Sequence, residues 1–127
     1  MKYFISILVL LISCSSENFR NAEDALDAAR EFKDGCLKGN FQKAAFYVID
    51  SKINIDRLNA IKTAYNNKGS QEKRDLKEAS IMIKLNKSIS PDLSEIVLTN
   101  SAERNYDTLK VVLQKGKWLV DNIQFHK

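Results

Sequence analysis

Histidine, cysteine and proline are scarce in this chain of 127 residues, which holds one histidine, two cysteines and one proline. The histidine, His126, stands one residue from the end, where we expect a solvated tail that cannot hold a general base against a substrate. A zinc site needs several cysteine or histidine ligands, and a calcium loop needs carboxylates at alternate positions, but the sequence has neither pattern. We therefore expect no metal and no cofactor.

Glycine is also sparse, and the motifs built on it are missing. The four glycines are dispersed at expected turns, so the sequence has no glycine-rich phosphate loop and no Gly-x-Ser-x-Gly turn for a serine nucleophile. Charge of one sign is in small excess only, because twenty Lys and Arg oppose sixteen Asp and Glu, which leaves a net charge of +4. This balance predicts no nucleic-acid partner.

One long apolar run is present, and it lies at the start of the chain. Lys2 precedes an apolar run over residues 3–12, which is followed by Ser13 and Cys14. A basic residue, a short apolar run and a small residue before the cleavage site are typical of a secretory signal peptide, and the run is too short to span a bilayer as a stable helix. The sequence therefore predicts a signal peptide over residues 1–13.

The residues Leu11-Ile12-Ser13-Cys14 resemble a bacterial lipobox. That resemblance implies a lipoprotein in which Cys14 becomes the N-terminus and carries acyl chains that hold it on a membrane of the cell envelope. Residues 14–20 would then be a lipidated tether, and Ser15 in place of an aspartate favours the outer membrane over the inner. The alternatives are an ordinary signal peptide or an uncleaved anchor, each with an incidental cysteine.

Cys36 is the only other cysteine, so a lipidated Cys14 leaves no partner for a disulfide within the chain. An exposed thiol is a liability in an oxidising compartment, and we therefore expect Cys36 to be buried as a small apolar residue. A reactive thiol would instead need a nearby base and a positively charged setting.

Helical periodicity begins directly after the tether. Apolar residues recur at three- and four-residue steps along 21–36, with Asn21 as the expected N-cap and Gly35 and Gly39 expected to weaken and end the helix. The residues of this apolar stripe are Ala22, Ala25, Leu26, Ala29, Phe32 and Cys36.

Two shorter helices are predicted next, over 41–48 with Asn40 as the cap and over 54–66. In the second of these, one face is expected to carry Ile55, Leu58, Ile61 and Tyr65. Residues 70–78 are highly charged, and their pattern leaves a polar helical turn and a mobile loop both open.

From Ala79 onward the apolar period changes to two, which predicts strands. We expect an antiparallel meander with strands from residue 79, over 95–102, over 108–114 and over 118–125, a loop over 88–94 and a tight hairpin centred on Gly116.

The last of these strands has a change of phase. Strict alternation places Trp118 and Val120 on one face and Ile123 and Phe125 on the other. One extra residue at 121–122 would bring all four side chains to the same face, so we predict a β-bulge there, which would bend the sheet enough to wrap a helix.

The order of elements resembles the nuclear transport factor 2-like superfamily, the cystatin-like α+β cone, and in particular its small bacterial lipoproteins of unassigned function. The residues that carry this resemblance are Ala29-x-x-Phe32, Lys38-Gly39-Asn40-Phe41-x-x-Ala44 and Gly116-Lys117-Trp118-Leu119-Val120-Asp121. The resemblance implies one α+β domain over residues 21–127, with N-terminal helices packed on a curved antiparallel meander. A cone-shaped pocket would lie between the sheet and the helices.

Enzymes of this superfamily place Asp, His or Tyr in that pocket. Asp50 and Asp121 lie beside apolar residues, so they are the candidate bases of an isomerase-like or cyclase-like enzyme. Each also has a structural interpretation, Asp50 as a helix cap and Asp121 as a bulge residue that faces water. The aromatic residues expected to line the pocket or the core are Phe32, Tyr47, Tyr65 and Trp118.

Because the only histidine is poorly placed for catalysis, we expect a non-enzymatic domain that binds a small ligand or another envelope protein. The alternative is the small enzyme just described, which would need a buried carboxylate with a raised pKa beside a tyrosine. Relatives in this superfamily often pair through the sheet, and an open antiparallel face needs cover, so a homodimer through the sheet is also expected.

Overall fold

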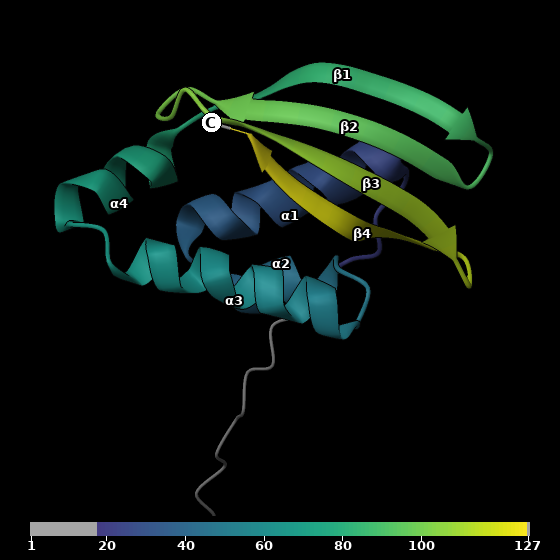
Figure 1. The fold of residues 1–127 in the computed structure, drawn as a ribbon, viewed down its shortest axis with the longest axis horizontal. Helices are drawn as coiled ribbons and strands as arrows, with labels where there is room; N and C mark the ends of the chain where they lie inside the picture. The colour runs from purple at the N-terminus through teal and green to yellow at the C-terminus, as the bar shows by residue number, and fades with distance from the viewer. Residues whose placement is uncertain (1–17, 127) are drawn as a thin grey trace, which may run out of the picture.

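The computed structural model describes residues 18–126 and has an α+β fold with four helices on one face of a four-stranded sheet (Figure 1). The predicted signal peptide and Cys14 lie outside the described residues. The helices are α1 (Ala25–Lys38), α2 (Phe41–Phe46), α3 (Lys52–Asn66) and α4 (Ser70–Glu78), and the strands are β1 (Ile81–Ser90), β2 (Leu93–Asn100), β3 (Tyr106–Gln114) and β4 (Lys117–His126).

Helix α1 begins later than the sequence predicts. Its N-cap is Asp24 and not Asn21, because the Asp24 side chain accepts a hydrogen bond from the Asp27 amide at 2.7 Å. Gly35 lies inside the helix, where an added Cβ would come within 2.8 Å of the backbone nitrogen of Ala44. Gly35 therefore lets α2 approach closely, and the helix ends at Gly39, which has a φ of 70°.

The second and third helices also differ from prediction at their ends. Asn40 caps α2 as expected, but the helix ends at Phe46 because Val48 pairs in parallel with Val120 of β4. Ser51 caps α3 through the Asn54 amide, so the predicted cap role of Asp50 is wrong.

The inward face of α3 also differs from the predicted one. Asn54 and Leu58 are buried, whereas Ile55, predicted to lie on the inner face, is 43% exposed. Residues 70–78, left open by the sequence, form the helix α4. No helix in the part of the chain that the structure describes is long and apolar enough to cross a membrane.

The sheet has the order β1-β2-β3-β4, and every neighbouring pair is antiparallel, as predicted. The predicted bulge is confirmed, because Lys110 pairs with Asn122 and Val111 pairs with Val120, which leaves Asp121 without a partner in β3. The expected loop over 88–94 is wrong, since β1 extends to Ser90.

The end of β4 corrects one further expectation. His126 was expected in a solvated tail, but it is the last residue of β4, and its backbone lies opposite Tyr106 of β3.

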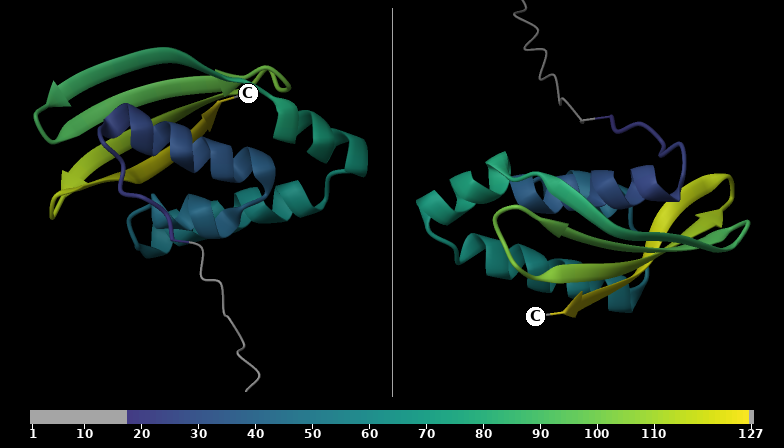
Figure 2. Two further views of the ribbon diagram at one scale, coloured as in Figure 1. Left: turned by 180° about the vertical axis from the view of Figure 1, so that it is seen from behind. Right: turned by 90° about the horizontal axis from the view of Figure 1, so that it is seen from above.

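Helices cover only the inner face of the curved sheet (Figure 2). Helix α1 crosses this concave face, and α2 and α3 lie beyond it (Figure 1). The buried core joins α1 and α2 to the strands. It includes Phe32 of α1, Ala44 of α2, and the strand residues Ile96, Leu98, Leu109, Val111, Val120 and Ile123. The bulge keeps Val120 and Ile123 on this same inner face, and this is how the sheet curves around α1.

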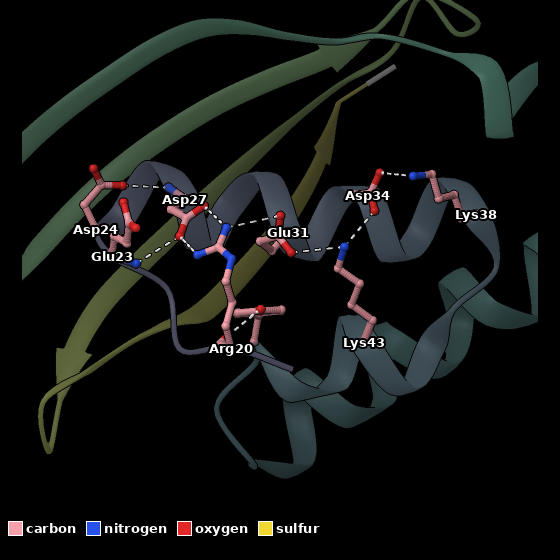
Figure 3. Close-up of polar contacts among 9 residues, drawn as sticks. Arg20, Glu23, Asp24, Asp27, Glu31, Asp34, Lys38 and Lys43 are labelled. Atoms are coloured by element: carbon pink, nitrogen blue, oxygen red, sulfur yellow. Dashed lines mark hydrogen bonds and ion pairs between the residues drawn. The ribbon is translucent and has the colours of Figure 1, made fainter. Parts of the chain in front are cut away.

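Residues 18–23, which we call the strap, lie against α1 and α2 and are not helical (Figure 3). Arg20 pairs with Asp27 at 2.5 Å and with Glu31 at 3.6 Å, and its carbonyl accepts a hydrogen bond from the Tyr47 hydroxyl at 2.6 Å. The Glu23 amide donates to Asp27 at 2.9 Å. These contacts hold the strap on the helices and explain why the chain does not turn into α1 at Asn21.

Candidate functional site

A cavity of about 370 Å³ lies between the helices and the end of the sheet where β2 leads into β3. Its apolar lining comes from three helices, with Leu37 of α1, Ile61 and Ala64 of α3, and Leu76 of α4. Its polar lining comes from α1 and α3, from the turn after α3 and from the end of the sheet, and consists of Lys33, Tyr65, Lys68, Asn100, Glu103, Asn105 and Asp107. The cavity therefore combines an apolar lining with a few polar groups, as small-molecule sites usually do.

The most buried charges in this cavity form one ion pair. The Lys33 ammonium donates to the Asp107 carboxylate at 2.7 Å, and the two side chains are only 12% and 8% exposed. Lys33 comes from the flank of α1 and Asp107 from β3, whose buried residues alternate from Asp107 through Leu109 to Val111. The pair links the helix to the sheet at the polar side of the cavity.

A second, more exposed ion pair lies at the cavity's edge. The Lys68 ammonium is 3.8 Å from the Glu103 carboxylate, in side chains that are 27% and 33% exposed. Asn100 shapes the loop that carries Glu103, because its Oδ1 accepts from the amides of Ala102 and Glu103 at 2.9 and 3.0 Å. Its Nδ2 also donates to the Glu103 carboxylate at 3.3 Å, which fixes that side chain beside the cavity.

Cys36 lines the same cavity and is buried, as predicted. Burial raises the pKa of its thiol to about 12, while the Lys33 ammonium opposes that rise and the Asp107 carboxylate adds to it. The thiol is therefore protonated near neutral pH, and a protonated thiol is a poor nucleophile.

The two candidate bases lie elsewhere. Asp50 and Asp121 are both exposed to solvent, and neither lines the cavity. Asp121 lies at the bulge of β4, where its carboxylate accepts a long hydrogen bond of 3.5 Å from the side-chain Nδ2 of Asn54. Neither carboxylate has the dry setting that an isomerase-like base requires.

The four aromatic candidates divide between core and cavity. Tyr65 lines the cavity, and its ring meets Phe41 edge-on with centroids 5.7 Å apart. Phe32 and Tyr47 are each 1% exposed and belong to the core. Trp118 packs against the core at the far end of the sheet, where a smaller hollow also touches the strap.

The Lys33–Asp107 pair was not predicted from the sequence. A weak signal was present, since Lys33 stands four residues after Ala29 and three before Cys36, on the edge of the apolar stripe of α1. Asp107 shares the period of two with Leu109 and Val111. Neither signal shows that the two residues meet, because 74 positions separate them.

Other site types find little support in the described part of the chain. Residues 18–126 contain no group of three or more His, Cys, Asp or Glu side chains that could hold a metal ion. A larger hollow of about 730 Å³ lies open on the outer face of the sheet, over Met82, Val97 and Tyr106, but it lacks the enclosed polar pair of the inner cavity.

Comparison with known proteins supports the fold and goes no further. No family model matches the sequence, and no curated protein sequence matches it. A crystal structure of an NTF-2-like protein of unknown function from Shewanella oneidensis MR-1 is similar, with a TM-score of 0.58 and 14% identity over 80% of this chain and 95% of that one. The fold is NTF-2-like, as the sequence predicts, and a fold alone does not assign a function.

Proposed function

We propose that this protein is a lipoprotein of the bacterial cell envelope, anchored through Cys14, whose inner cavity binds a small ligand without transforming it. The observation that carries the binding role is the cavity itself, in which apolar side chains from three helices lie together with the Lys33–Asp107 and Lys68–Glu103 pairs. A concave, mostly apolar site with a few placed polar groups is how proteins usually hold small molecules.

The side chains around the cavity favour binding over chemistry. Its thiol, on Cys36, is protonated, and its most buried carboxylate, on Asp107, already accepts from an ammonium. The carboxylates that the sequence offers as bases, on Asp50 and Asp121, are exposed and lie outside the cavity.

The anchor is supported by the sequence of the leader. Lys2, the apolar run over 3–12 and the Ser13-Cys14 pair together resemble a lipoprotein signal. Asn18 is the first residue that the structure describes, and it stands four positions after Cys14, so a fully extended link between them spans about 14 Å at most. A link of this length keeps the domain at the membrane surface, and Ser15 favours the outer membrane over the inner.

Metabolic labelling with radioactive palmitate tests the anchor. The parent protein takes up label, Cys14→Ser does not, and Cys36→Ser serves as the matched control that keeps it. Label on Cys14→Ser, or a parent protein that begins at Met1 and enters the aqueous phase of a detergent partition, would contradict the anchor.

Mass spectrometry of small molecules retained by the natively purified protein tests the cavity. Ala64 lines the cavity and is exposed at its edge, so Ala64→Trp is expected to block it without disturbing the core. Ala45 is exposed on α2 outside the cavity, and Ala45→Trp is the matched control. A molecule retained equally by both variants would not be bound in this cavity.

A further inference from the structure

The charges around the inner cavity cancel. Two are positive, on Lys33 and Lys68, and two are negative, on Glu103 and Asp107. Each positive group has a negative partner from the lining within 4 Å, at 2.7 Å for Lys33 and 3.8 Å for Lys68, and Lys68 also lies 3.9 Å from Glu72, which does not line the cavity. A ligand in the cavity therefore meets dipoles and not a field of one sign.

This arrangement penalises a ligand that carries net charge. A carboxylate near the Lys33–Asp107 pair would be attracted by the ammonium and repelled by Asp107, which lies only 2.7 Å from that ammonium. The repulsion offsets part of the attraction, so the attraction that is left compensates only in part for the loss of the carboxylate's own hydration. An ammonium ligand meets the same difficulty with the signs reversed.

A ligand with a neutral polar head can form hydrogen bonds with both members of the Lys33–Asp107 pair. The Lys33 ammonium has three N–H groups and donates one of them to Asp107 in the described structure, so it can donate to a ligand oxygen as well. The carboxylate of Asp107 has a second oxygen that can accept from a ligand O–H or N–H. A hydroxyl or a primary amide can satisfy both groups at once without breaking the pair.

The rest of the cavity defines the body of the ligand. Leu37, Ile61 and Leu76 give the cavity an apolar surface beside its two ion pairs. A volume of about 370 Å³ lies at the small end of the range for ligand pockets, so the body is a short chain or a small ring system.

We infer that this cavity selects amphipathic molecules without net charge, with an apolar body against α1, α3 and α4 and a hydroxyl or amide at the Lys33–Asp107 pair. It rejects carboxylates and amines that have the same body. This inference rests on the proposed function, because it names the ligand class for that cavity.

Three probes with one body and different heads test it, namely 1-octanol, octanoate and octylammonium, titrated into the purified protein at pH 7. Binding is followed by calorimetry and located by the amide shifts of Cys36 and Leu37. In the parent protein, 1-octanol is expected to bind at least about tenfold more tightly than either charged probe. Octanoate or octylammonium bound as tightly as 1-octanol would overturn the inference.

Two substitutions at the Lys33–Asp107 pair are each expected to shift the preference of the cavity toward one of the charged probes. Asp107→Asn, nearly isosteric, removes the negative partner of Lys33, so octanoate is expected to gain about tenfold in affinity while octylammonium does not. Lys33→Gln is expected to favour octylammonium by the same logic. Unchanged probe preferences in a folded Asp107→Asn protein would also overturn the inference.

The matched cavity variants separate this inference from the function on which it rests. If Ala64→Trp abolishes binding of the preferred probe and Ala45→Trp does not, the cavity is the binding site. The order of the three probes' affinities then decides whether the cavity prefers uncharged ligands. If no probe binds the parent, or if both tryptophan variants bind equally, the cavity is not the site and the proposed function fails with the inference.

Discussion

Arg20 holds Asp27 through two hydrogen bonds, one from Nη1 at 2.5 Å and one from Nη2 at 2.8 Å, although the residues are seven positions apart (Figure 3). The same Asp27 carboxylate accepts a hydrogen bond from the Glu23 amide, so it binds the strap both at Arg20 and at its last residue. Phe19 adds an apolar contact, because its ring centroid lies 5.6 Å from that of Phe46. The point where the chain enters α1 is thus fixed by side chains and not by a helix cap alone.

The Arg20–Asp27 ion pair predicts a contribution to stability that is lost in acid. The Arg20 hydrogen bonds hold the pKa of Asp27 below its ordinary 3.8, against the opposing effect of desolvation. A carboxyl whose folded pKa is depressed stabilises the fold above its unfolded pKa, and this stabilisation is lost as the pH falls through the folded value. Asp27→Asn should therefore be less stable than the parent at pH 6, with a difference that shrinks as the pH falls below about 4.

Chemical denaturation at a series of pH values measures this difference. Asp75 is exposed on α4 and accepts only from Gln71 in the described structure, so Asp75→Asn is a control expected to change stability little at any pH. A constant difference between the Asp27→Asn protein and the parent from pH 6 to pH 3 would show that the ionised Asp27 carboxylate does not stabilise the fold through Arg20.

The close approach of α1 and α2 predicts a large effect of one methyl group. A Cβ on Gly35 would lie 2.8 Å from the Ala44 nitrogen and 2.9 Å from the Asn40 oxygen, and these backbone atoms cannot move without shifting α2. We expect Gly35→Ala to lower the free energy of unfolding by about 1–3 kcal/mol, despite the better helix propensity of alanine.

Urea denaturation followed by circular dichroism checks this value. A Cβ added to Gly69 would meet no atom within 4 Å, and Gly69 lies at the start of α4, so Gly69→Ala is the matched control with a smaller expected loss. Equal losses in the two variants would show that helix packing at Gly35 is not the cause.

Some tertiary features were predictable because a single strand carries their signal. The bulge at Asp121 could be predicted because Trp118, Val120, Ile123 and Phe125 are out of phase by one residue, and only an insertion restores one apolar face. The hairpin was predictable from Gly116, because glycine readily takes the positive φ of 76° found there, whereas nothing in the sequence indicates the positive φ of 51° at Lys115.

Other features depend on contacts between distant segments, and local patterns cannot reveal these. Asn21 is a good helix cap by residue type, but the contact between Arg20 and Asp27 competes with that local choice and moves the cap to Asp24. The Lys33–Asp107 pair depends on a distant contact in the same way, because the weak local signal at each residue does not show that the two side chains meet.

Helix α3 is attached to the bulge by one side chain, which predicts a further stability effect. Arg57 donates to the Asn122 side chain at 2.9 Å and to the carbonyl of Ile123, so it joins α3 to β4 directly beside the bulge. Replacing a charged donor of this kind removes hydrogen bonds that typically contribute about 1.5–3 kcal/mol each, and we expect Arg57→Met to lose about 2 kcal/mol of unfolding free energy.

Thermal and urea denaturation measure that loss, with Lys62→Met as the control. Lys62 is exposed on the same helix, so its replacement is expected to change stability by less than about 0.5 kcal/mol. Hydrogen exchange should also quicken at the amides of β4 beside Asn122 in the Arg57→Met protein. An unchanged exchange rate there would mean that Arg57 does not hold the bulge.

The outer face of the sheet is where we expect the predicted homodimer to form. Met82, Leu85 and Tyr106 are 43%, 40% and 43% exposed on it, and no helix covers this face within residues 18–126. The edge strand β1 is a poorer contact, because its register shifts twice and it carries Lys84 and Lys87, features that discourage edge-to-edge pairing. Two copies are therefore expected to associate face to face.

Sedimentation equilibrium measures this association, and a charge placed on the face should break it. Leu85→Lys puts an ammonium at the centre of the expected interface, so this variant should be monomeric at concentrations where the parent is dimeric. Ile53 is 59% exposed on α3, away from the sheet, which makes Ile53→Lys a control of the same chemistry that should leave the dimer intact. If Ile53→Lys dissociates the dimer and Leu85→Lys does not, the contact is made by the helices, and the apolar residues of the sheet face must be covered in some other way.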